Sequence, residues 1–145
     1  MIHSTKIILD RNLKTDFANA KIYQQGKILV FYDKTITKPN VNNKNIQFIP
    51  ADTINEKLDI KEILGKIYKL GIMSIFVESG GTLNASFLPY ADKIYHFMAP
   101  KILGDNNGKS CFDGTFVEKI SQCAKFKIES AEILSPDIIL TYIKY

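Results

Sequence analysis

Residues 72–88 read IMSIFVESGGTLNASFL, and this stretch decides the expected fold. The continuous apolar run over residues 72–77 has the length and the β-branching of a strand that is buried on both faces. Two glycines, Gly80 and Gly81, follow this run and permit a positive φ or the close approach of a ligand to the backbone. Residues 82–88 then have a helical pattern with Leu83, Phe87 and Leu88 on the core side. The sequence therefore predicts a strand, a glycine turn and a helix in succession.

This strand–turn–helix arrangement is suited to binding an anion. The first N–H groups of a helix have no acceptor within the helix, and the helix dipole places partial positive charge at that end. We therefore expect a phosphate at the start of the helix over residues 82–88. A tight connection between strand and helix, without a ligand, is the alternative interpretation.

The composition is that of one ordinary globular domain. The chain has 145 residues, and we expect residues 1–145 to form a single domain. Hydrophobic residues make up 46% and charged residues 23% of the chain. The net charge of +4 comes from lysines that are scattered along the sequence, so a small anionic ligand is favoured over nucleic acid. No apolar run approaches membrane-spanning length, so no membrane association is expected.

The two cysteines, Cys111 and Cys123, lack the spacing of a metal site, and no metal is expected. They are interpreted as reduced thiols of a cytoplasmic protein. No neighbour in the sequence indicates that Cys111 is an activated thiolate. His96, in the middle of an expected strand, is interpreted as structural.

Three short apolar segments read as strands before the central stretch, over residues 6–9, 27–32 and 46–49. The last of them is expected to stop at Pro50. Residues 13–25 read as a loop with a helical turn, and residues 37–45 as a surface loop rich in Asn and Pro.

The clearest helix lies between the third of these strands and the central one. One apolar face is formed by Ile60, Ile63, Leu64, Ile67 and Leu70. Asp59 is expected to cap its start, with Glu62 completing a capping box, and Gly71 is expected to end it in a left-handed conformation. The pattern predicts a β-α-β unit with parallel strands at 46–49 and 72–77.

The C-terminal half has a different pattern. Residues 93–99 read as a strand that ends at Pro100, and residues 104–114 read as a loop. Residues 125–134 and 138–145 read as two antiparallel strands joined by a turn at Ser135, Pro136 and Asp137. The expected architecture is α/β, with a parallel core and an antiparallel C-terminal hairpin.

Several motifs occur together in the order of a known family. Residues 77–83 (VESGGTL), 86–88 (SFL) and 99–104 (APKILG) resemble the reductase domain of riboflavin biosynthesis, which is the C-terminal half of the bifunctional pyrimidine deaminase/reductase. Asp92 lies where that family has an acidic residue, KIILDRNLK at 6–14 is similar to an early family strand, and EILSPDIILTYI at 132–143 is similar to its last hairpin. The resemblance implies a dihydrofolate-reductase-like α/β fold, with a mostly parallel sheet flanked by helices and an antiparallel C-terminal hairpin.

The resemblance extends over about the last two-thirds of that reductase domain. The family motifs K-x-A-x-S-L-D-G and D-N-P-x-L-T-x-R do not occur in this sequence. The zinc deaminase motifs H-x-E and P-C-x-x-C do not occur either, so deaminase chemistry is not expected.

The resemblance implies an activity and a set of site residues. NADPH would deliver hydride to C1′ of the ribosyl group of 5-amino-6-(5-phosphoribosylamino)uracil, a pyrimidine ribosyl phosphate, to give the ribitylamino phosphate. The residues matched to the pyrophosphate turn are Gly80, Gly81, Thr82, Leu83, Asn84, Ala85 and Ser86. Glu78 matches a substrate contact and Arg11 a cofactor contact, where a guanidinium could pair with the 2′-phosphate. Lys34 is a weaker candidate for that phosphate, and no catalytic residue is assigned.

Alternatives remain open for these residues and for the function. Glu78 could cap the following helix, and Arg11 and Lys34 could be solvated surface charges. A nucleotide-binding or interaction domain without turnover, or another dihydrofolate-reductase-like reductase, would also fit the pattern. A homodimer is expected, because relatives commonly pair through this domain and the C-terminal strands carry apolar residues on both faces.

Overall fold

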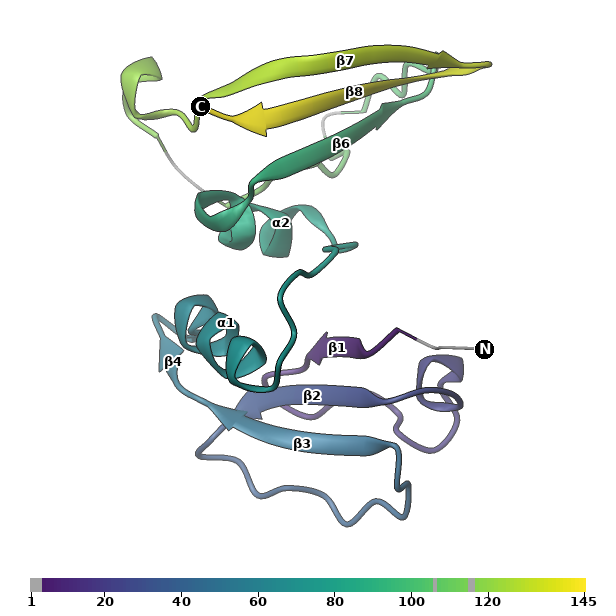
Figure 1. The fold of residues 1–145 in the computed structure, drawn as a ribbon, viewed down its shortest axis with the longest axis vertical. Coiled ribbons are helices and arrows are strands. Elements are labelled where there is room, and N and C mark those ends of the chain that lie inside the picture. Colours follow the sequence, from purple (N-terminus) through teal and green to yellow (C-terminus); the bar gives the residue numbers. More distant parts are fainter. Residues whose placement is uncertain (1–3, 106, 115–116) are drawn as a thin grey trace. The chain divides into compact units, whose positions relative to one another are not determined.

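The computed structural model describes residues 4–105, 107–114 and 117–145 (Figure 1). The chain divides into two compact units, of which the first ends at Ile75 and the second begins at Phe76. Each unit is described by itself.

The first unit contains a parallel three-stranded sheet, as the sequence predicts (Figure 1). Its strands are β1 (Lys6–Leu9), β2 (Ile28–Asp33) and β3 (Ile46–Ala51), with β2 in the middle. The apolar run of β2 is buried from Ile28 to Tyr32, which is the behaviour expected of a strand that is covered on both faces.

Pro50 does not stop the third strand, contrary to the prediction from sequence. β3 continues through Pro50 to Ala51, and Pro50 lies opposite Tyr32 of β2. Within the described sheet β3 has a neighbour on one side only. A proline is tolerated at such an edge, because its missing N–H is not needed by a second neighbour.

A short hairpin that the sequence did not predict connects β3 to the first helix. It consists of β4 (Thr53–Ile54) and β5 (Lys57–Leu58). The two residues between them, Asn55 and Glu56, have φ values of 49° and 59°. Positive φ at both central positions is the geometry of the turn that matches the natural twist of a hairpin.

Helix α1 (Ile60–Lys69) has the predicted start and end. The Asp59 carboxylate accepts hydrogen bonds from the N–H groups of Lys61 and Glu62 at 2.9 and 3.2 Å, and Gly71 ends the helix with a φ of 81°. Of the predicted capping box, the Asp59 half is confirmed and the Glu62 half is wrong. The Glu62 carboxylate accepts a hydrogen bond from the N–H of Asp52 at 2.7 Å, because the Asp59 N–H is already donated to the Asp52 carbonyl oxygen.

The two faces of the sheet are covered differently. Helix α1 packs Ile63 and Ile67 against Leu29 and Phe31 on one face. The opposite face, with Ile28 and Val30, is covered by side chains of the long segment between β1 and β2, namely Leu13, Phe17, Ala20 and Tyr23. That segment contains the predicted helical turn, η1 (Lys21–Tyr23). The first unit therefore has a core on each side of β2.

The predicted strand over residues 72–77 is wrong. These residues belong to no strand or helix. Ile72 and Ile75 pack against the core under α1, whereas 78% of Met73 and 70% of Phe76 is exposed. A strand needs a hydrogen-bonded neighbour, and no described residue pairs with this segment. The predicted β-α-β unit is therefore absent from the part of the chain that the structure describes.

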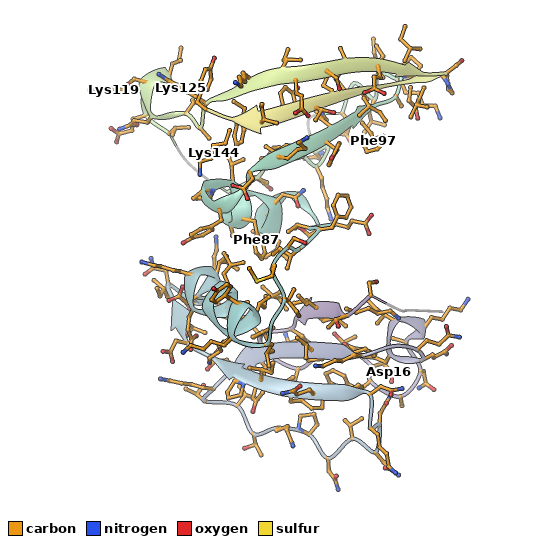
Figure 2. All side chains as sticks on the ribbon, viewed as in Figure 1. Asp16, Phe87, Phe97, Lys119, Lys125 and Lys144 are labelled. Atoms are coloured by element: carbon orange, nitrogen blue, oxygen red, sulfur yellow. The ribbon has the colours of Figure 1, made fainter. Side chains whose placement is uncertain are left out.

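The second unit begins with helix α2 (Gly81–Phe87), followed by the short η2 (Leu88–Tyr90). Ala85 and Phe87 are the buried residues of α2, and Phe87 is labelled in Figure 2. Leu83 and Leu88, which were expected on the core side with Phe87, are half-buried.

An antiparallel three-stranded sheet completes the second unit (Figure 1). Its strands are β6 (Lys93–Met98), β7 (Phe126–Leu134) and β8 (Asp137–Lys144), with β8 in the middle. Before β7 the chain forms a short turn, η3 (Ile120–Gln122). The predicted C-terminal hairpin is confirmed, but it belongs to a separate sheet and does not extend the parallel one.

The α/β class expected from the sequence is thus confirmed. None of the helices in the described ranges is long and apolar enough to cross a membrane.

Candidate functional site

The predicted anion site lies at the start of α2. Gly80 precedes the helix with a φ of −79° and a ψ of 166°. Neither Gly80 nor Gly81 has a positive φ. The turn therefore does not use the left-handed conformation that the sequence allowed. The two glycines instead differ in what lies beside them.

Gly81 is needed because another part of the chain approaches it closely. A β-carbon at this position would overlap with the Ser110 carbonyl oxygen and would lie 3.1 Å from Cβ of Asp113. The Asp113 N–H also donates to the Gly81 carbonyl oxygen at 3.0 Å. The close approach that the sequence suggested for a ligand is therefore made by the segment around residues 110–113.

A small hydrogen-bond network fixes this contact. The Asn84 amide nitrogen donates to the Cys111 carbonyl oxygen at 3.0 Å and to the Ser79 carbonyl oxygen at 3.2 Å. The Ser79 hydroxyl donates to the Asn84 amide oxygen at 2.6 Å. Ser79 and Asn84 therefore hold the turn before α2 and the 110–113 segment together.

The Gly80 side of the turn is open. A β-carbon at Gly80 would meet nothing within 4 Å. The N–H groups of Leu83 and Asn84 donate to the Gly80 carbonyl oxygen at 3.1 and 3.0 Å. For the N–H groups of Gly81 and Thr82, no acceptor is found among the residues that the structure describes. These two N–H groups are the ones an anion could use.

The remaining residues of the predicted turn have mainly structural contacts. The Ser86 hydroxyl donates to the Thr82 carbonyl oxygen at 3.0 Å, within the helix. Ala85 is buried and Leu83 is half-buried, so these two residues support the helix from its inner side. Glu78 is exposed on the approach to the turn.

Arg11 and Lys34 lie in the first unit, at the edge where the parallel strands end. Arg11 follows β1 by two residues, and Lys34 directly follows β2. The Asp33 N–H donates to the Arg11 carbonyl oxygen at 3.0 Å, which holds these two strand ends together. The carboxyl edge of a parallel sheet is the usual place for ligands in α/β proteins.

The charges at this edge are already partly engaged. The Arg11 guanidinium donates to the Glu56 carbonyl oxygen, which is uncharged. The Lys34 ammonium lies 2.5 Å from the Asp52 carboxylate. Hydrogen bonding to that carboxylate raises the pKa of Lys34. Among the described residues no carboxylate forms an ion pair with Arg11, although the Arg11 charge contributes to lowering the pKa of Asp33, whereas Lys34 is paired with Asp52.

Two aspartates at the same edge accept hydrogen bonds from the loops that follow their strands. The Asp10 carboxylate accepts hydrogen bonds from the Lys14 N–H at 3.0 Å and from the Thr15 N–H and hydroxyl at 2.8 and 2.6 Å. The Asp33 carboxylate accepts bonds from the N–H and hydroxyl of Thr35, which lower the pKa of Asp33. Both carboxylates therefore organise loops that follow their strands.

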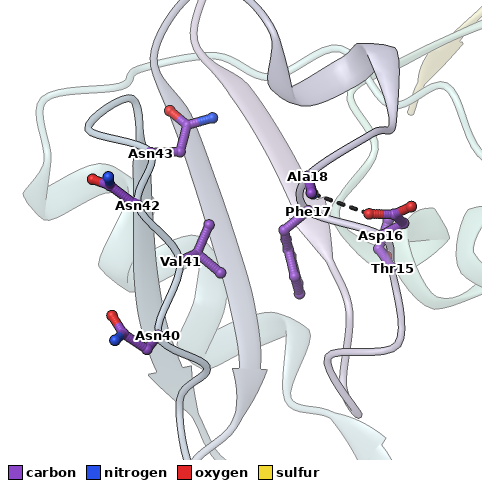
Figure 3. A pocket seen from close by; sticks show the side chains of 8 residues that line it. All are labelled: Thr15, Asp16, Phe17, Ala18, Asn40, Val41, Asn42 and Asn43. Carbon is purple, nitrogen blue, oxygen red and sulfur yellow. Dashed lines mark hydrogen bonds between the residues drawn. The ribbon is translucent and has the colours of Figure 1, made fainter.

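The first unit also has an open hollow that the sequence did not indicate (Figure 3). It has a volume of about 610 Å³ and lies between two loops, lined by Thr15, Asp16, Phe17, Ala18, Asn40, Val41, Asn42 and Asn43. The Asp16 carboxylate accepts a hydrogen bond from the Ala18 N–H at 3.0 Å within this lining (Figure 3). None of the predicted site residues lines it, so it is separate from the predicted site.

The predicted residues thus form two groups. Glu78 and residues 80–86 are brought together around the start of α2, and Arg11 and Lys34 are brought together at the edge of the parallel sheet. Sequence reasoning named Asn84 and Arg11 but missed the contacts that hold them in place, from Asn84 to Cys111 and from Arg11 to Glu56. The only local signal was Asn55, a typical turn residue beside Glu56.

Comparison with known proteins places these features in a family. The sequence matches the family described as "RibD C-terminal domain" over residues 3–140. The chain belongs to the RibD C-terminal domain family. Its fold is also that of solved RibD reductase domains, a dihydrofolate-reductase-like α/β fold. RibD of Acinetobacter baumannii has a TM-score of 0.78 at 23% identity, and the match covers 96% of this chain and 37% of that one.

Two relatives connect this RibD-type domain to named proteins. The riboflavin biosynthesis protein RibD of Aquifex aeolicus is 30% identical over 145 residues, covering 97% of this chain and 38% of that protein. The 2,5-diamino-6-ribosylamino-4(3H)-pyrimidinone 5′-phosphate reductase of Methanothermobacter thermautotrophicus is 25% identical over 101 residues, covering 68% of this chain and 46% of that protein. The chain therefore spans less than half the length of each of these relatives.

Proposed function

We propose that this chain is part of a riboflavin-pathway pyrimidine reductase that reduces 5-amino-6-(5-phosphoribosylamino)uracil to the ribitylamino phosphate with NADPH. The observation that carries the proposal is the family match over residues 3–140. It is supported by the Methanothermobacter relative, which is named as a reductase of a ribosylaminopyrimidinone phosphate. The substrate is accordingly a small pyrimidine ribosyl phosphate, and nucleic acid and membranes are not proposed as partners.

The open side of the turn before α2 fits a pyrophosphate. Among the described residues, the N–H groups of Gly81 and Thr82 are donors without an acceptor, and no atom beyond the chain neighbours lies within 4 Å of a β-carbon placed at Gly80. Backbone N–H groups at a helix start bind phosphate oxygens, because they carry partial positive charge and cost little reorganisation. We therefore propose that residues 80–86 form the pyrophosphate turn, with Leu83, Ala85 and Ser86 supporting its shape and Asn84 anchoring it.

Arg11 is the proposed contact of the 2′-phosphate that distinguishes NADPH from NADH. Among the described residues its guanidinium donates a hydrogen bond to the neutral Glu56 carbonyl oxygen and forms no ion pair, so an incoming phosphate would not have to displace a paired carboxylate. Lys34 would first have to leave Asp52, from which its ammonium is separated by 2.5 Å. Lys34 is therefore the weaker of the two phosphate contacts.

Glu78 is the proposed substrate contact. Its side chain is exposed next to the turn, and a carboxylate there can accept hydrogen bonds from ribose hydroxyls. Bound NADPH would supply the hydride itself. The contribution of this chain would be to hold the pyrophosphate and the ribose hydroxyls in position.

Three further properties belong to the same proposal. We propose a single domain over residues 1–145, a cytoplasmic location and a homodimer. The dimer is supported by apolar side chains of the C-terminal strands that are exposed in the chain by itself, namely Ile128 (63%), Ile133 (80%) and Ile138 (40%). Size-exclusion chromatography with light scattering tests it, and a monomer at high protein concentration would contradict it.

Two measurements on the purified chain test the proposed function. Calorimetric titration with NADPH is expected to show saturable binding that is stronger than binding of NADH. Oxidation of NADPH in the presence of the ribosylaminouracil phosphate is expected to show turnover.

The outcomes distinguish the alternatives. Saturable NADPH binding without turnover would favour a nucleotide-binding domain. Turnover with a different pterin or pyrimidine would favour another dihydrofolate-reductase-like reductase. If no saturable signal appears at millimolar cofactor, the proposed NADPH site at Gly81 and Thr82 is wrong for this chain.

A further inference from the structure

Three side chains from separate segments of the second unit meet next to the antiparallel sheet. The sulfur of Cys111 lies 3.6 Å from Nε2 of His96, and the hydroxyl oxygen of Tyr142 lies 3.5 Å from Nδ1 of the same imidazole. In the sequence Cys111 is 15 residues from His96, and Tyr142 is 46 residues from it. The sequence patterns therefore gave no indication of this cluster.

The pairing of β6 with β8 explains how His96 meets Tyr142. Ile94 lies opposite Tyr142, and His96 is two residues further along β6, so it points to the same face of the sheet. Diagonal neighbours on one face of an antiparallel pair are within reach of aromatic side chains. The centroids of the two rings are 6.2 Å apart.

Contacts with α2 bring Cys111 to the imidazole. The Cys111 carbonyl oxygen accepts the amide of Asn84 at 3.0 Å, and the Asp113 N–H donates to the Gly81 carbonyl oxygen at 3.0 Å. The segment is thereby held on α2 at Cys111 itself and at Asp113. Cys111 itself remains exposed, so its sulfur is accessible to a reagent from solution.

We propose that Cys111 is a nucleophilic thiol that exchanges with small disulfides of the glutathione-disulfide class, with His96 as its general base. This site goes beyond the proposed reductase function and does not depend on it. A thiol beside an imidazole that is oriented by a third group is the usual arrangement of an activated cysteine. Here Tyr142 is a positioning residue, because it contacts the imidazole and not the sulfur.

The exchange can be written with these three side chains and the disulfide alone. With the Nδ1–H of His96 donated to the Tyr142 hydroxyl oxygen, the lone pair on Nε2 faces the thiol and takes its proton. The Cys111 thiolate attacks one sulfur of the disulfide, so that a new S–S bond forms and the original S–S bond breaks. The leaving thiolate takes the proton from the imidazolium. The products are one mixed disulfide at Cys111 and one free small thiol.

Cys123 provides an internal control. Its thiol is also exposed. Among the residues that the structure describes, its sulfur has no hydrogen-bond partner and no histidine beside it, in contrast to Cys111. The two cysteines are therefore both exposed, and they differ in the neighbouring base.

The test measures thiol–disulfide exchange in single-cysteine variants of the full chain. C123S leaves Cys111 and C111S leaves Cys123. With glutathione disulfide or 5,5′-dithiobis(2-nitrobenzoate) at neutral pH, Cys111 is expected to react about tenfold faster than Cys123. H96Q in the C123S background is expected to lower the rate to that of Cys123. In alkaline buffer this deficit should shrink, because hydroxide then removes the thiol proton without the imidazole.

Several results would overturn the proposal. Equal rates for Cys111 and Cys123 at neutral pH, or no loss of rate in folded H96Q, would exclude the base role of His96. If H96Q does not fold, Y142F in the C123S background replaces it, and an unchanged rate in this variant would also contradict the proposal. A loss of rate in Y142F that is restored in alkaline buffer supports it.

Discussion

The Ser110 carbonyl oxygen lies directly against Gly81, in the space that a β-carbon would occupy. The Asp113 N–H completes the contact by donating to the Gly81 carbonyl oxygen at 3.0 Å. A glycine at the first position of α2 is thus required by a segment of the chain about thirty residues further on, which its sequence neighbours do not indicate. The Gly80 side of the turn, by contrast, is open.

Gly81→Ala is expected to destabilise the second unit by about 1–3 kcal/mol, because the segment at 110–113 or the start of α2 must move. Thermal unfolding followed by circular dichroism measures this loss. Gly65→Ala in α1 is the matched control, because a β-carbon at Gly65 would meet nothing within 4 Å. There the gain in helix propensity is expected to stabilise the protein by about 0.5–1 kcal/mol. The same sign for both variants would contradict the close approach at Gly81.

Glu62 is expected to stabilise the first unit through Asp52 and not through Asp59. Its carboxylate accepts the Asp52 N–H at 2.7 Å and lies 2.6 Å from the Lys66 ammonium. Glu62→Ala removes the acceptor and is expected to cost about 1–2 kcal/mol in the free energy of unfolding. Glu62→Gln keeps an acceptor oxygen and should cost less, as measured by urea denaturation. Equal losses in the two variants would show that the charge, and not the hydrogen bond, matters.

Asp10 is expected to make the stability of the first unit depend on acidic pH. Burial raises the pKa of Asp10, but hydrogen bonds from Thr15, Lys14 and Leu13 together outweigh it and hold the pKa below its usual value. The folded state therefore binds the proton less readily than the unfolded chain. The resulting stabilisation is complete above the unfolded pKa of about 4 and is lost as the pH falls through the lower folded pKa.

Asp10→Asn should flatten this acid dependence and lower the stability at neutral pH by about 1–2 kcal/mol, because charged acceptors make the stronger hydrogen bonds. Urea denaturation at a series of pH values measures both effects. Glu56→Gln is the control, because the Glu56 side chain is exposed and makes no hydrogen bond among the described residues. An unchanged acid dependence in Asp10→Asn would show that other carboxylates cause it.

Arg11→Ala tests the proposed cofactor preference. Loss of a charged contact with the 2′-phosphate is expected to weaken NADPH binding about tenfold or more and to leave NADH binding nearly unchanged. Lys34→Ala should have a smaller effect, because the Lys34 ammonium is already paired with Asp52 at 2.5 Å. Lys38→Ala, an exposed lysine in the loop before β3, controls for the loss of one positive charge. Equal weakening of both cofactors in Arg11→Ala would contradict a contact with the 2′-phosphate.

Much of the local structure could be predicted from the sequence. The strands at 6–9 and 27–32, the helix with its Asp59 cap and Gly71 end, and the C-terminal hairpin follow from periodicity and from turn and cap residues. These features depend on residues within a few positions of one another, and so a linear pattern contains them. The order of the motifs also indicated the family, which the match over residues 3–140 confirms.

The tertiary structure alone decided the features that depend on distant neighbours. The run over 72–77 has the composition of a buried strand, but a strand forms only where another strand offers hydrogen bonds, and none of the described residues does so. Glu62 accepts a hydrogen bond from Asp52, Ser110 lies against Gly81, and the Cys111 sulfur lies beside the His96 imidazole. Each contact forms because folding brings together groups that are far apart in the sequence. Composition and periodicity specify which surfaces a segment can bury, whereas the partner that covers each surface is set only when the chain has folded.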